Sequence, residues 1–174
     1  MRTQLSISAL ALAGAAGATG ASAQSVEPSA LLRGVHPVAP VQRYDSGCGL
    51  QREGDGLLAL GRDYKATLDA GGMTFVPALG GRAPRLFPVG FELSSIERGG
   101  EVVLGAPAEV APRQDGLIAV YDRENGIQER YEAIPGGLEQ SFVFPSEPGA
   151  SGDLVVRGRV ATELEGASAG AELF

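Results

Sequence analysis

The sequence is poor in the residues on which most enzyme active sites depend. Its 174 residues include one histidine, one cysteine and no tryptophan. A zinc site made of histidine and cysteine needs roughly three or four such ligands, and a Ser-His-Asp triad needs a well-placed histidine. A single cysteine also cannot form a disulfide within the chain. Aromatic residues, which usually line sugar-binding clefts, make up only 6% of the sequence.

Positive charge is scarce as well. The 21 acidic residues outnumber the 14 basic ones, and the net charge is −7. Binding to a phosphate backbone requires a basic face, so we expect no nucleic-acid partner. The sequence also lacks a Walker loop, the motifs G-x-S-x-G and H-E-x-x-H, and a G-x-G-x-x-G that opens a helix. We therefore expect no enzymatic activity, no cofactor and no bound metal.

Long apolar runs are confined to the start of the chain, which has the pattern of a secretory signal peptide. Arg2 supplies a positive charge, and residues 5–18 are apolar or small without any charge. Small residues then occupy both ends of Ala21-Ser22-Ala23, which is typical of a cleavage site. We predict a helical signal peptide over residues 1–23, removed after Ala23. The alternative is an uncleaved membrane anchor, but the run is short of the roughly 20 strongly apolar residues that a spanning helix needs. The mature chain is then predicted to have no integral membrane segment and to be periplasmic, secreted or on the cell surface.

The segment that follows is predicted to be a linker or N-terminal arm. Residues 24–42 contain three prolines and little periodicity. The only histidine, His36, lies in this arm, where a solvated residue is a better interpretation than a metal ligand or general base. Cys48 follows in a glycine-rich turn. It has no adjacent basic group that would lower its pKa, so an inert thiol is favoured over a nucleophile.

Residues 43–174 show the alternation of β-strands and the turn residues of hairpins. A turn at Gly54-Asp55-Gly56 and another over residues 69–72 separate apolar alternating runs. Residues 87–93 alternate strictly, and residues 101–104 form another short strand. The two prolines within residues 105–115 indicate a loop.

The last third of the chain holds the strongest strand signals. Residues 117–121 are followed by a turn ending in Asn125-Gly126, and residues 127–134 return. After Pro135-Gly136-Gly137, the side chains of Leu138, Gln140, Phe142 and Phe144 share one face. Within residues 153–164, one face carries Leu154, Val156, Val160 and Leu164, and the other carries Asp153, Arg157, Arg159 and Glu163.

These patterns predict an all-β fold. Turns recur every 8–12 residues or so, and no 3.6-residue period is sustained after residue 23. We expect a single β-rich domain over residues 43–174, built as an antiparallel β-sandwich or as stacked twisted sheets. No repeat with a fixed period is visible, which argues against a propeller or solenoid within these residues.

Several short strings resemble a known module type. They are Tyr121-Asp122-Arg123, Asn125-Gly126-Ile127, Glu129-Arg130-Tyr131, Gly136-Gly137-Leu138-Glu139-Gln140-Ser141-Phe142 and Gly152-Asp153-Leu154. Together they resemble the N-terminal uncharacterised β-rich module of large exported bacterial proteins of planctomycete or myxobacterial type, which often precedes FG-GAP-type β-propeller repeats. The resemblance spans about residues 43–174 and implies no catalytic residues. Because such modules usually continue into a further strand, we expect a piece of a longer protein or a short stand-alone version.

A few oxygen-bearing side chains are candidates for binding. Glu139 and Gln140 place a carboxylate beside an amide, which could bind sugar or calcium. Strand packing explains them better, with Glu139 outward and Gln140 hydrogen-bonded to a neighbour. Asp122, Glu124 and Asn125 could bind calcium weakly, although a turn with positive φ accounts for them equally well.

Two functions remain open from the sequence, and we favour the first. It is a non-catalytic structural or interaction module whose partner is a following domain or another cell-surface protein. The alternative is a carboxylate-dependent glycan hydrolase, or a calcium-dependent binding domain. A hydrolase predicts a cleft with two acids about 5–10 Å apart. The module predicts a last strand that is unpaired or exposes apolar surface.

Overall fold

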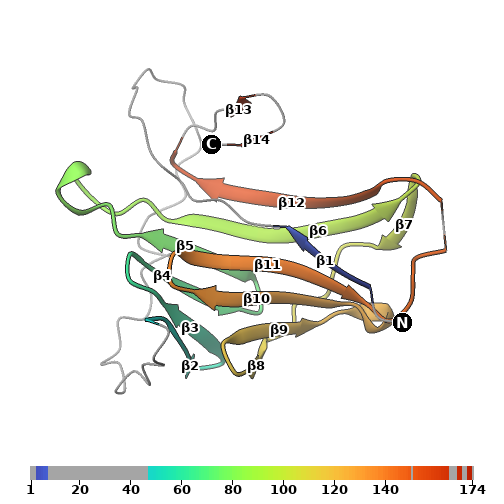
Figure 1. The fold of residues 1–174 in the computed structure, drawn as a ribbon, viewed down its shortest axis with the longest axis horizontal. Helices are drawn as coiled ribbons and strands as arrows, with labels where there is room; N and C mark the ends of the chain where they lie inside the picture. The colour runs from blue at the N-terminus through green and yellow to red at the C-terminus, as the bar shows by residue number, and fades with distance from the viewer. Residues whose placement is uncertain (1–2, 8–46, 150, 165–167, 170–171, 174) are drawn as a thin grey trace.

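The computed structural model describes residues 3–7, 47–149, 151–164, 168–169 and 172–173, and within these ranges the regular structure is almost entirely β-strand. Two antiparallel sheets face each other and share a core (Figure 1). The prediction of an all-β fold is therefore confirmed, and the arrangement is sandwich-like. Two short 3-10 helices, η2 (Gly80–Arg82) and η3 (Glu124–Gly126), are the helical segments of this part of the chain.

The smaller sheet contains five strands in the order β1-β11-β10-β9-β8. Four of them come from the second half of the chain, and the fifth comes from its first residues. Neighbours along the chain pair as hairpins, whereas β1 joins β11 from far away in sequence. Their bounds are β1 (Thr3–Ile7), β8 (Arg113–Asp115), β9 (Ile118–Asp122), β10 (Gln128–Ile134) and β11 (Gly137–Phe144).

The larger sheet has the order β12-β6-β5-β4-β3-β2, and β7 pairs with β6 beyond the end of β5. Most of it is a meander of hairpins, to which β12 is added late in the chain. Its strands are β2 (Gly49–Glu53), β3 (Gly56–Leu60), β4 (Tyr64–Asp69), β5 (Gly72–Pro77), β6 (Val89–Arg98), β7 (Glu101–Leu104) and β12 (Leu154–Thr162). A separate short pair is formed by β13 (Ser168–Ala169) and β14 (Glu172–Leu173).

The predicted hairpins are confirmed. Strands β2 and β3 turn at Gly54-Asp55, and β4 and β5 turn at Ala70-Gly71, with Gly71 N–H donating to the Asp69 carboxylate at 2.8 Å. The predicted Asn-Gly turn closes at η3, where Asn125 has φ 57° and is the one non-glycine residue of the described chain with positive φ. Asparagine tolerates this left-handed conformation better than most residues.

The core lies between the sheets and divides into two clusters. The first cluster joins β2, β3 and β4 of the larger sheet to β9, β10 and β11 of the smaller one. The second joins β6 and β7 to β11 and to Ile127, with Leu154 and Val156 of β12 packed against it. Tyr64 hydroxyl donates across the layers to Ile134 O at 2.9 Å, and Cys48 Sγ donates to Ala133 O at 3.2 Å. The Cys48 thiol is buried, as expected for an inert cysteine.

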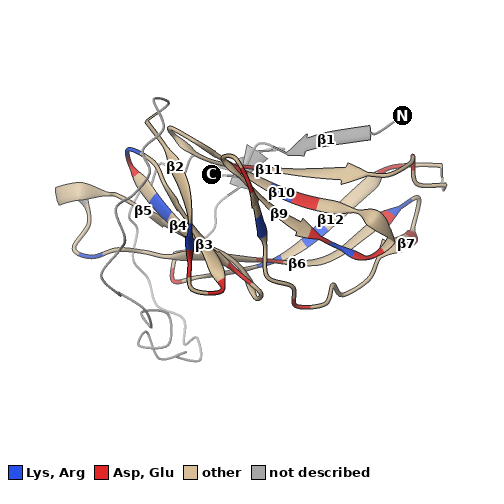
Figure 2. Cartoon of the chain, turned by 90° about the horizontal axis from the view of Figure 1, so that it is seen from below, with Lys and Arg blue, Asp and Glu red and all other residues tan. Residues whose placement is uncertain are grey.

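Strand β12 departs in part from its predicted pattern. Leu154 and Val156 pack against the core as expected, but Val160 is 60% exposed. The prediction of a buried side chain at this position is wrong because the buried core extends only under the first part of the strand. The polar face is as predicted, with Arg157 paired to Glu97 and Arg159 paired to Glu92 on β6. Figure 2 shows the two signs of charge interspersed along these neighbouring strands.

The predicted signal helix is not shown. Of residues 1–23 the structure describes only residues 3–7, and these form strand β1. The predicted arm at residues 24–42, including His36, lies outside the described residues. Within the part of the chain that the structure describes, no helix has the length and apolar character required to cross a membrane.

Candidate functional site

The most unusual chemical feature of the interior is a buried carboxylate. Glu129, on β10, is 1% exposed, and it is the only acidic side chain buried among the described residues. The Arg123 side chain, 6% exposed, forms an ion pair with it. Burying a charge is costly unless the group is paired and hydrogen-bonded. Glu129 and its neighbours are therefore the candidate functional site of the described residues.

Both oxygens of Glu129 are fully engaged by donors. Oε2 accepts from Arg123 Nη2 at 2.8 Å and from Arg123 Nε at 3.1 Å. Oε1 accepts from the Tyr131 hydroxyl at 2.6 Å and from Gln140 Nε2 at 2.9 Å. The Gln140 amide also donates to the Tyr131 hydroxyl at 2.9 Å, which closes a ring of contacts among three side chains. We call Arg123, Glu129, Tyr131 and Gln140 the buried polar cluster.

Strand alternation and register bring the buried polar cluster together. Glu129 and Tyr131 alternate with outward residues on β10, so both point into the core. Gln140 lies directly opposite Tyr131 on β11. Arg123 follows the end of β9, and the turn at Asn125 directs the chain back so that Glu129 pairs with Tyr121.

Arg123 is held by more than its carboxylate partner. Its guanidinium carbon lies 4.6 Å from the centre of the Tyr121 ring, a cation–π distance, and Nη1 donates to Ala108 O at 3.0 Å. Tyr121 in turn places its hydroxyl 2.9 Å from both Asp69 O and Gly72 O at the tip of the β4–β5 hairpin. These contacts connect the buried polar cluster to the larger sheet.

The buried tyrosines have perturbed acidity. Burial raises the pKa of Tyr131 well above its usual value, and the negative charge of Glu129 raises it further. Burial likewise raises the pKa of Tyr121, with Glu129 again adding to the effect. Both hydroxyls therefore stay protonated at neutral pH and act as donors, which is what the neighbouring carboxylate and carbonyl oxygens require.

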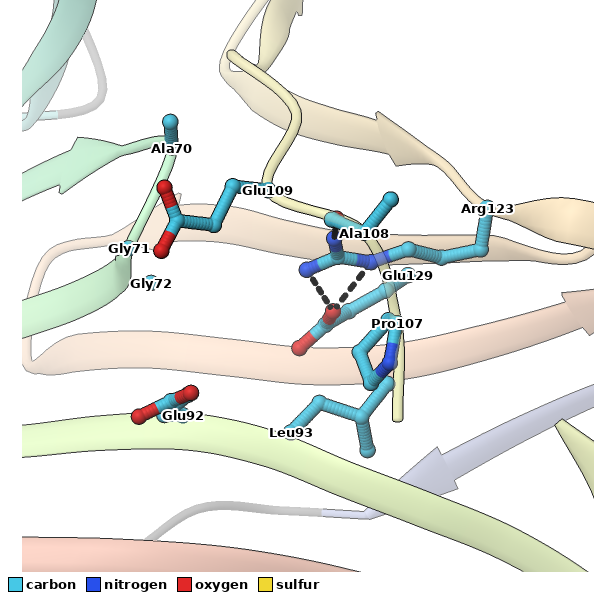
Figure 3. A pocket seen from close by; sticks show the side chains of 10 residues that line it. All are labelled: Ala70, Gly71, Gly72, Glu92, Leu93, Pro107, Ala108, Glu109, Arg123 and Glu129. Carbon is cyan, nitrogen blue, oxygen red and sulfur yellow. Dashed lines mark hydrogen bonds and ion pairs between the residues drawn. The ribbon is translucent and has the colours of Figure 1, made fainter. Parts of the chain in front are cut away.

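A small pocket opens beside the ion pair (Figure 3). Glu92 and Glu109 also line it, so three carboxylates surround it together with Arg123. Its volume is about 20 Å³, which is room for roughly one water molecule. Glu129 is bound by Arg123 at the wall, as the dashed lines show, and Glu92 is paired with Arg159. The pocket is thus too small for a sugar ring.

A larger hollow shares Gly71, Gly72 and Glu92 with this pocket. Its volume is about 200 Å³, and small residues such as Gly71, Gly90 and Ala161 leave the space. The charged side chains of Glu92 and Arg159 at its margin are paired with each other.

The structure separates the two residues of the predicted Glu139-Gln140 pair. Gln140 is buried in the polar cluster, whereas Glu139 is partly exposed on the opposite face of β11, across from Glu132. The preferred interpretation of Gln140, a hydrogen bond to a neighbouring strand, is confirmed. The two side chains do not converge on a common ligand.

The second predicted group behaves as a turn. Asp122 accepts from Arg113 Nε at 2.8 Å and from Gln128 Nε2 at 2.9 Å, and the bond to Arg113 is the main reason that the pKa of Asp122 is lowered. Asn125 Nδ2 donates to Val103 O at 3.3 Å, away from Asp122's partners. Glu124 is exposed within η3. Among the described residues, no group of three or more histidine, cysteine, aspartate or glutamate side chains could hold a metal ion.

Sequence reasoning missed Glu129 and Tyr131 as partners of Gln140, and Arg123 as the partner of Glu129. A signal for Glu129 was present, because it occupies an inward position in the alternating series Ile127, Glu129, Tyr131 and Ala133. Of the strings that carry the resemblance, Glu129-Arg130-Tyr131 and the one ending in Phe142 contain three of the four cluster residues, and Tyr121-Asp122-Arg123 contains the fourth. The structure gives these strings a physical reason, since the residues hydrogen-bond to one another.

Comparison with protein-family models, with curated proteins and with solved structures finds no match to the chain. The resemblance to an exported bacterial module stays a prediction.

Proposed function

We propose that this protein is an exported β-sandwich module that works by packing against another protein, such as a following domain or a cell-surface partner, in the periplasm or on the cell surface. The observation that carries the proposal is the outer edge of the larger sheet. Strand β12 pairs with β6 on one side and, among the described residues, has no strand on the other. It also exposes apolar side chains, with Val155 38% and Val160 60% exposed.

An exposed strand edge that carries apolar residues favours contact with a further chain. The interior supports the same proposal from another direction. Glu129, the best-placed carboxylate, already accepts four hydrogen bonds, all from side chains of β10, β11 and the turn after β9, so its oxygens are occupied within the smaller sheet. The buried polar cluster therefore serves the scaffold and leaves contact with partners to the surface.

The alternatives of a glycan hydrolase and a calcium-dependent binder have no comparable observation behind them. The pocket lined by three glutamates has room for about one water molecule. Asp122, the centre of the proposed calcium group, accepts from Arg113 and Gln128. We therefore do not propose either activity.

The test compares two surface valines on the exported protein. Val160→Glu places a charge on the β12 edge, and Val102→Glu does the same at an equally apolar position on β7, where Val102 is 67% exposed. Both substitutions are at exposed sites and should change stability by less than about 0.5 kcal/mol. We expect Val160→Glu to release the protein from the cell envelope into the soluble fraction, and Val102→Glu to leave it attached.

Thermal unfolding of both variants checks that folding is intact. Retention of Val160→Glu on the envelope, or a wild-type protein that never leaves the cytoplasm, would contradict the proposal.

A further inference from the structure

The smaller sheet is completed by a strand that the sequence assigns to the signal peptide. Strand β1 pairs antiparallel with β11 over five residues, from Thr3 opposite Phe144 to Ile7 opposite Gln140. It forms the outer strand of this sheet, as Figure 1 shows in blue. These residues lie inside the predicted leader, residues 1–23. Once the leader is removed, β11 loses the neighbour on its outer side.

The edge that removal uncovers differs from the outer edges at β8 and β2. Strand β8 is only three residues long, and β2 carries Arg52 and Glu53 within five residues. Short length and charged side chains are common means of protecting an edge from further pairing. Strand β11 has eight residues, one charge at Glu139, and no proline before Pro145. It has none of these protections over the stretch that β1 covers.

Leaving this edge open is also costly inside the core. Phe142 and Phe144 are buried at the centre of the second core cluster, and Ser141 and Val143 on the other face are nearly as well covered. Without a strand beside β11, a row of backbone N–H and C=O groups loses its partners next to these side chains. A replacement strand restores the backbone hydrogen bonds.

We propose that the exported chain accepts, at the outer edge of β11, a single extended segment of a partner protein that pairs antiparallel in the place of β1. The geometry that β1 adopts defines the partner's chemistry. The segment is at least five residues long, carries no charge, and has apolar residues at alternate positions, as Leu5 and Ile7 do in Thr3–Ile7. Addition of a strand to an open edge is a common way of recognising extended peptides, with backbone bonds supplying affinity and alternate side chains supplying selectivity.

A lone strand fits this edge better than a second copy of the chain. Strand β1 brings no second layer with it, whereas the β11 strand of another copy would bring a complete pair of sheets. The full chain carries a net charge of −7, and loss of the leader with Arg2 makes the exported chain more negative, which disfavours close association of two copies.

This inference rests on the export and cleavage that the proposed function includes, so the experiment tests these first. Mass spectrometry of the exported protein gives its N-terminus, which we expect at Gln24. Backbone amide exchange is then followed by NMR on residues 24–174. We expect fast exchange at alternate β11 amides, those that face away from β10. Addition of a capped peptide of residues 3–9, which carries no charge, should slow exchange at these amides at least tenfold.

Two N-methylated peptides separate strand pairing from general apolar adhesion. A paired strand turns only alternate amides toward its neighbour. One peptide is N-methylated at Gln4 and the other at Leu5. Only one of these two amides faces β11, so we expect one peptide to lose its protection of β11 and the other to keep it. Equal protection of β11 by the two N-methylated peptides, or no protection by the parent peptide, would overturn the proposal. An N-terminus at Gln24 in the same protein would show that export and cleavage had still occurred.

Two other outcomes also decide against it. Protection of β11 without peptide, together with a dimer in sedimentation, would show that a second copy fills the edge. An exported protein that retains Thr3–Ile7 would show that the edge is never opened, and would also contradict the leader assignment.

Discussion

At the scale of single residues, the interior depends on a charged group that a sequence pattern does not reveal as structural. Glu129 occupies a core position, where an apolar residue would be usual, and two features compensate for its burial. Arg123 neutralises its charge, and Tyr131 and Gln140 satisfy the remaining oxygen. A buried ion pair adds little net stability when complete, but removing one partner is strongly destabilising because the other charge is left uncompensated.

We therefore expect Glu129→Gln to destabilise the protein by about 3–5 kcal/mol. The carboxamide oxygen still accepts from Tyr131 and Gln140, whereas the new NH2 group faces the Arg123 donors, so the change removes both the charge and the acceptor opposite Arg123. Glu92→Gln is the matched control, because Glu92 pairs with Arg159 at the surface, where both side chains are more than half exposed. It should cost less than about 1 kcal/mol. Urea unfolding measures both, and similar losses for the two variants would contradict a structural role of the buried polar cluster.

At the scale of strands, most elements could be predicted from the sequence, because alternation and turn residues are local signals. The Asp69–Gly72 and Asn125-Gly126 turns lie where they were expected. The partners of Gln140 could not be predicted, since Glu129 and Tyr131 meet it only through the register of β10 against β11. The exposure of Val160 was missed for a related reason. Periodicity shows which face a residue occupies, but not how far the opposite sheet extends.

The junction of β6 and β12 shows another feature that no pattern reveals. The pairing shifts so that Leu93 faces Gly158 and Ser95 faces Arg157, which leaves Ser94 as an extra residue on β6. This bulge lets Leu93 and Ile96, three residues apart, both point into the core. Phe91 crosses directly over Gly158, where a Cβ atom would overlap the aromatic ring.

We predict that Gly158→Ala lowers the stability by about 1–3 kcal/mol, because the Phe91 ring must leave its position to make room. Gly90→Ala is the matched control on the neighbouring strand. A Cβ atom there meets Ala161 Cβ at 3.5 Å, an ordinary contact, so we expect a change near zero. Thermal unfolding of the two variants compares them. Equal melting temperatures for Gly158→Ala and the wild type would show that the close approach of Phe91 is not structurally significant.

At the scale of the whole molecule, tyrosines tie the two sheets together. Tyr64 on β4 reaches Ile134 of the smaller sheet, and Tyr121 on β9 reaches the tip of the β4–β5 hairpin. Tyr131 completes the buried polar cluster. Burial raises the pKa of all three hydroxyls above the ordinary value of 10.0. The connection between the layers is therefore sensitive to alkaline pH.

The sign of this dependence follows from the direction of the shifts. Below pH 10 the tyrosines are protonated in both the folded and the unfolded chain, so their contribution is fully present. Above pH 10 the unfolded chain loses these protons first, and stability falls as the pH rises toward the folded-state pKa values. Each buried tyrosine contributes a slope of about 1.4 kcal/mol per pH unit, or about 4 kcal/mol per unit for three.

We expect the free energy of unfolding, measured in urea, to decrease steeply above pH 10, and tyrosinate absorbance to appear together with unfolding. Tyr131→Phe provides the control, because it removes one of the three titrating groups. It should be less stable than the wild type at neutral pH, since the buried Glu129 loses a donor. Its slope above pH 10 should nevertheless be about one third smaller. Equal slopes for the two proteins, or a tyrosinate signal from Tyr64, Tyr121 or Tyr131 that precedes unfolding, would mean that these hydroxyls ionise within the folded structure and do not control its alkaline limit.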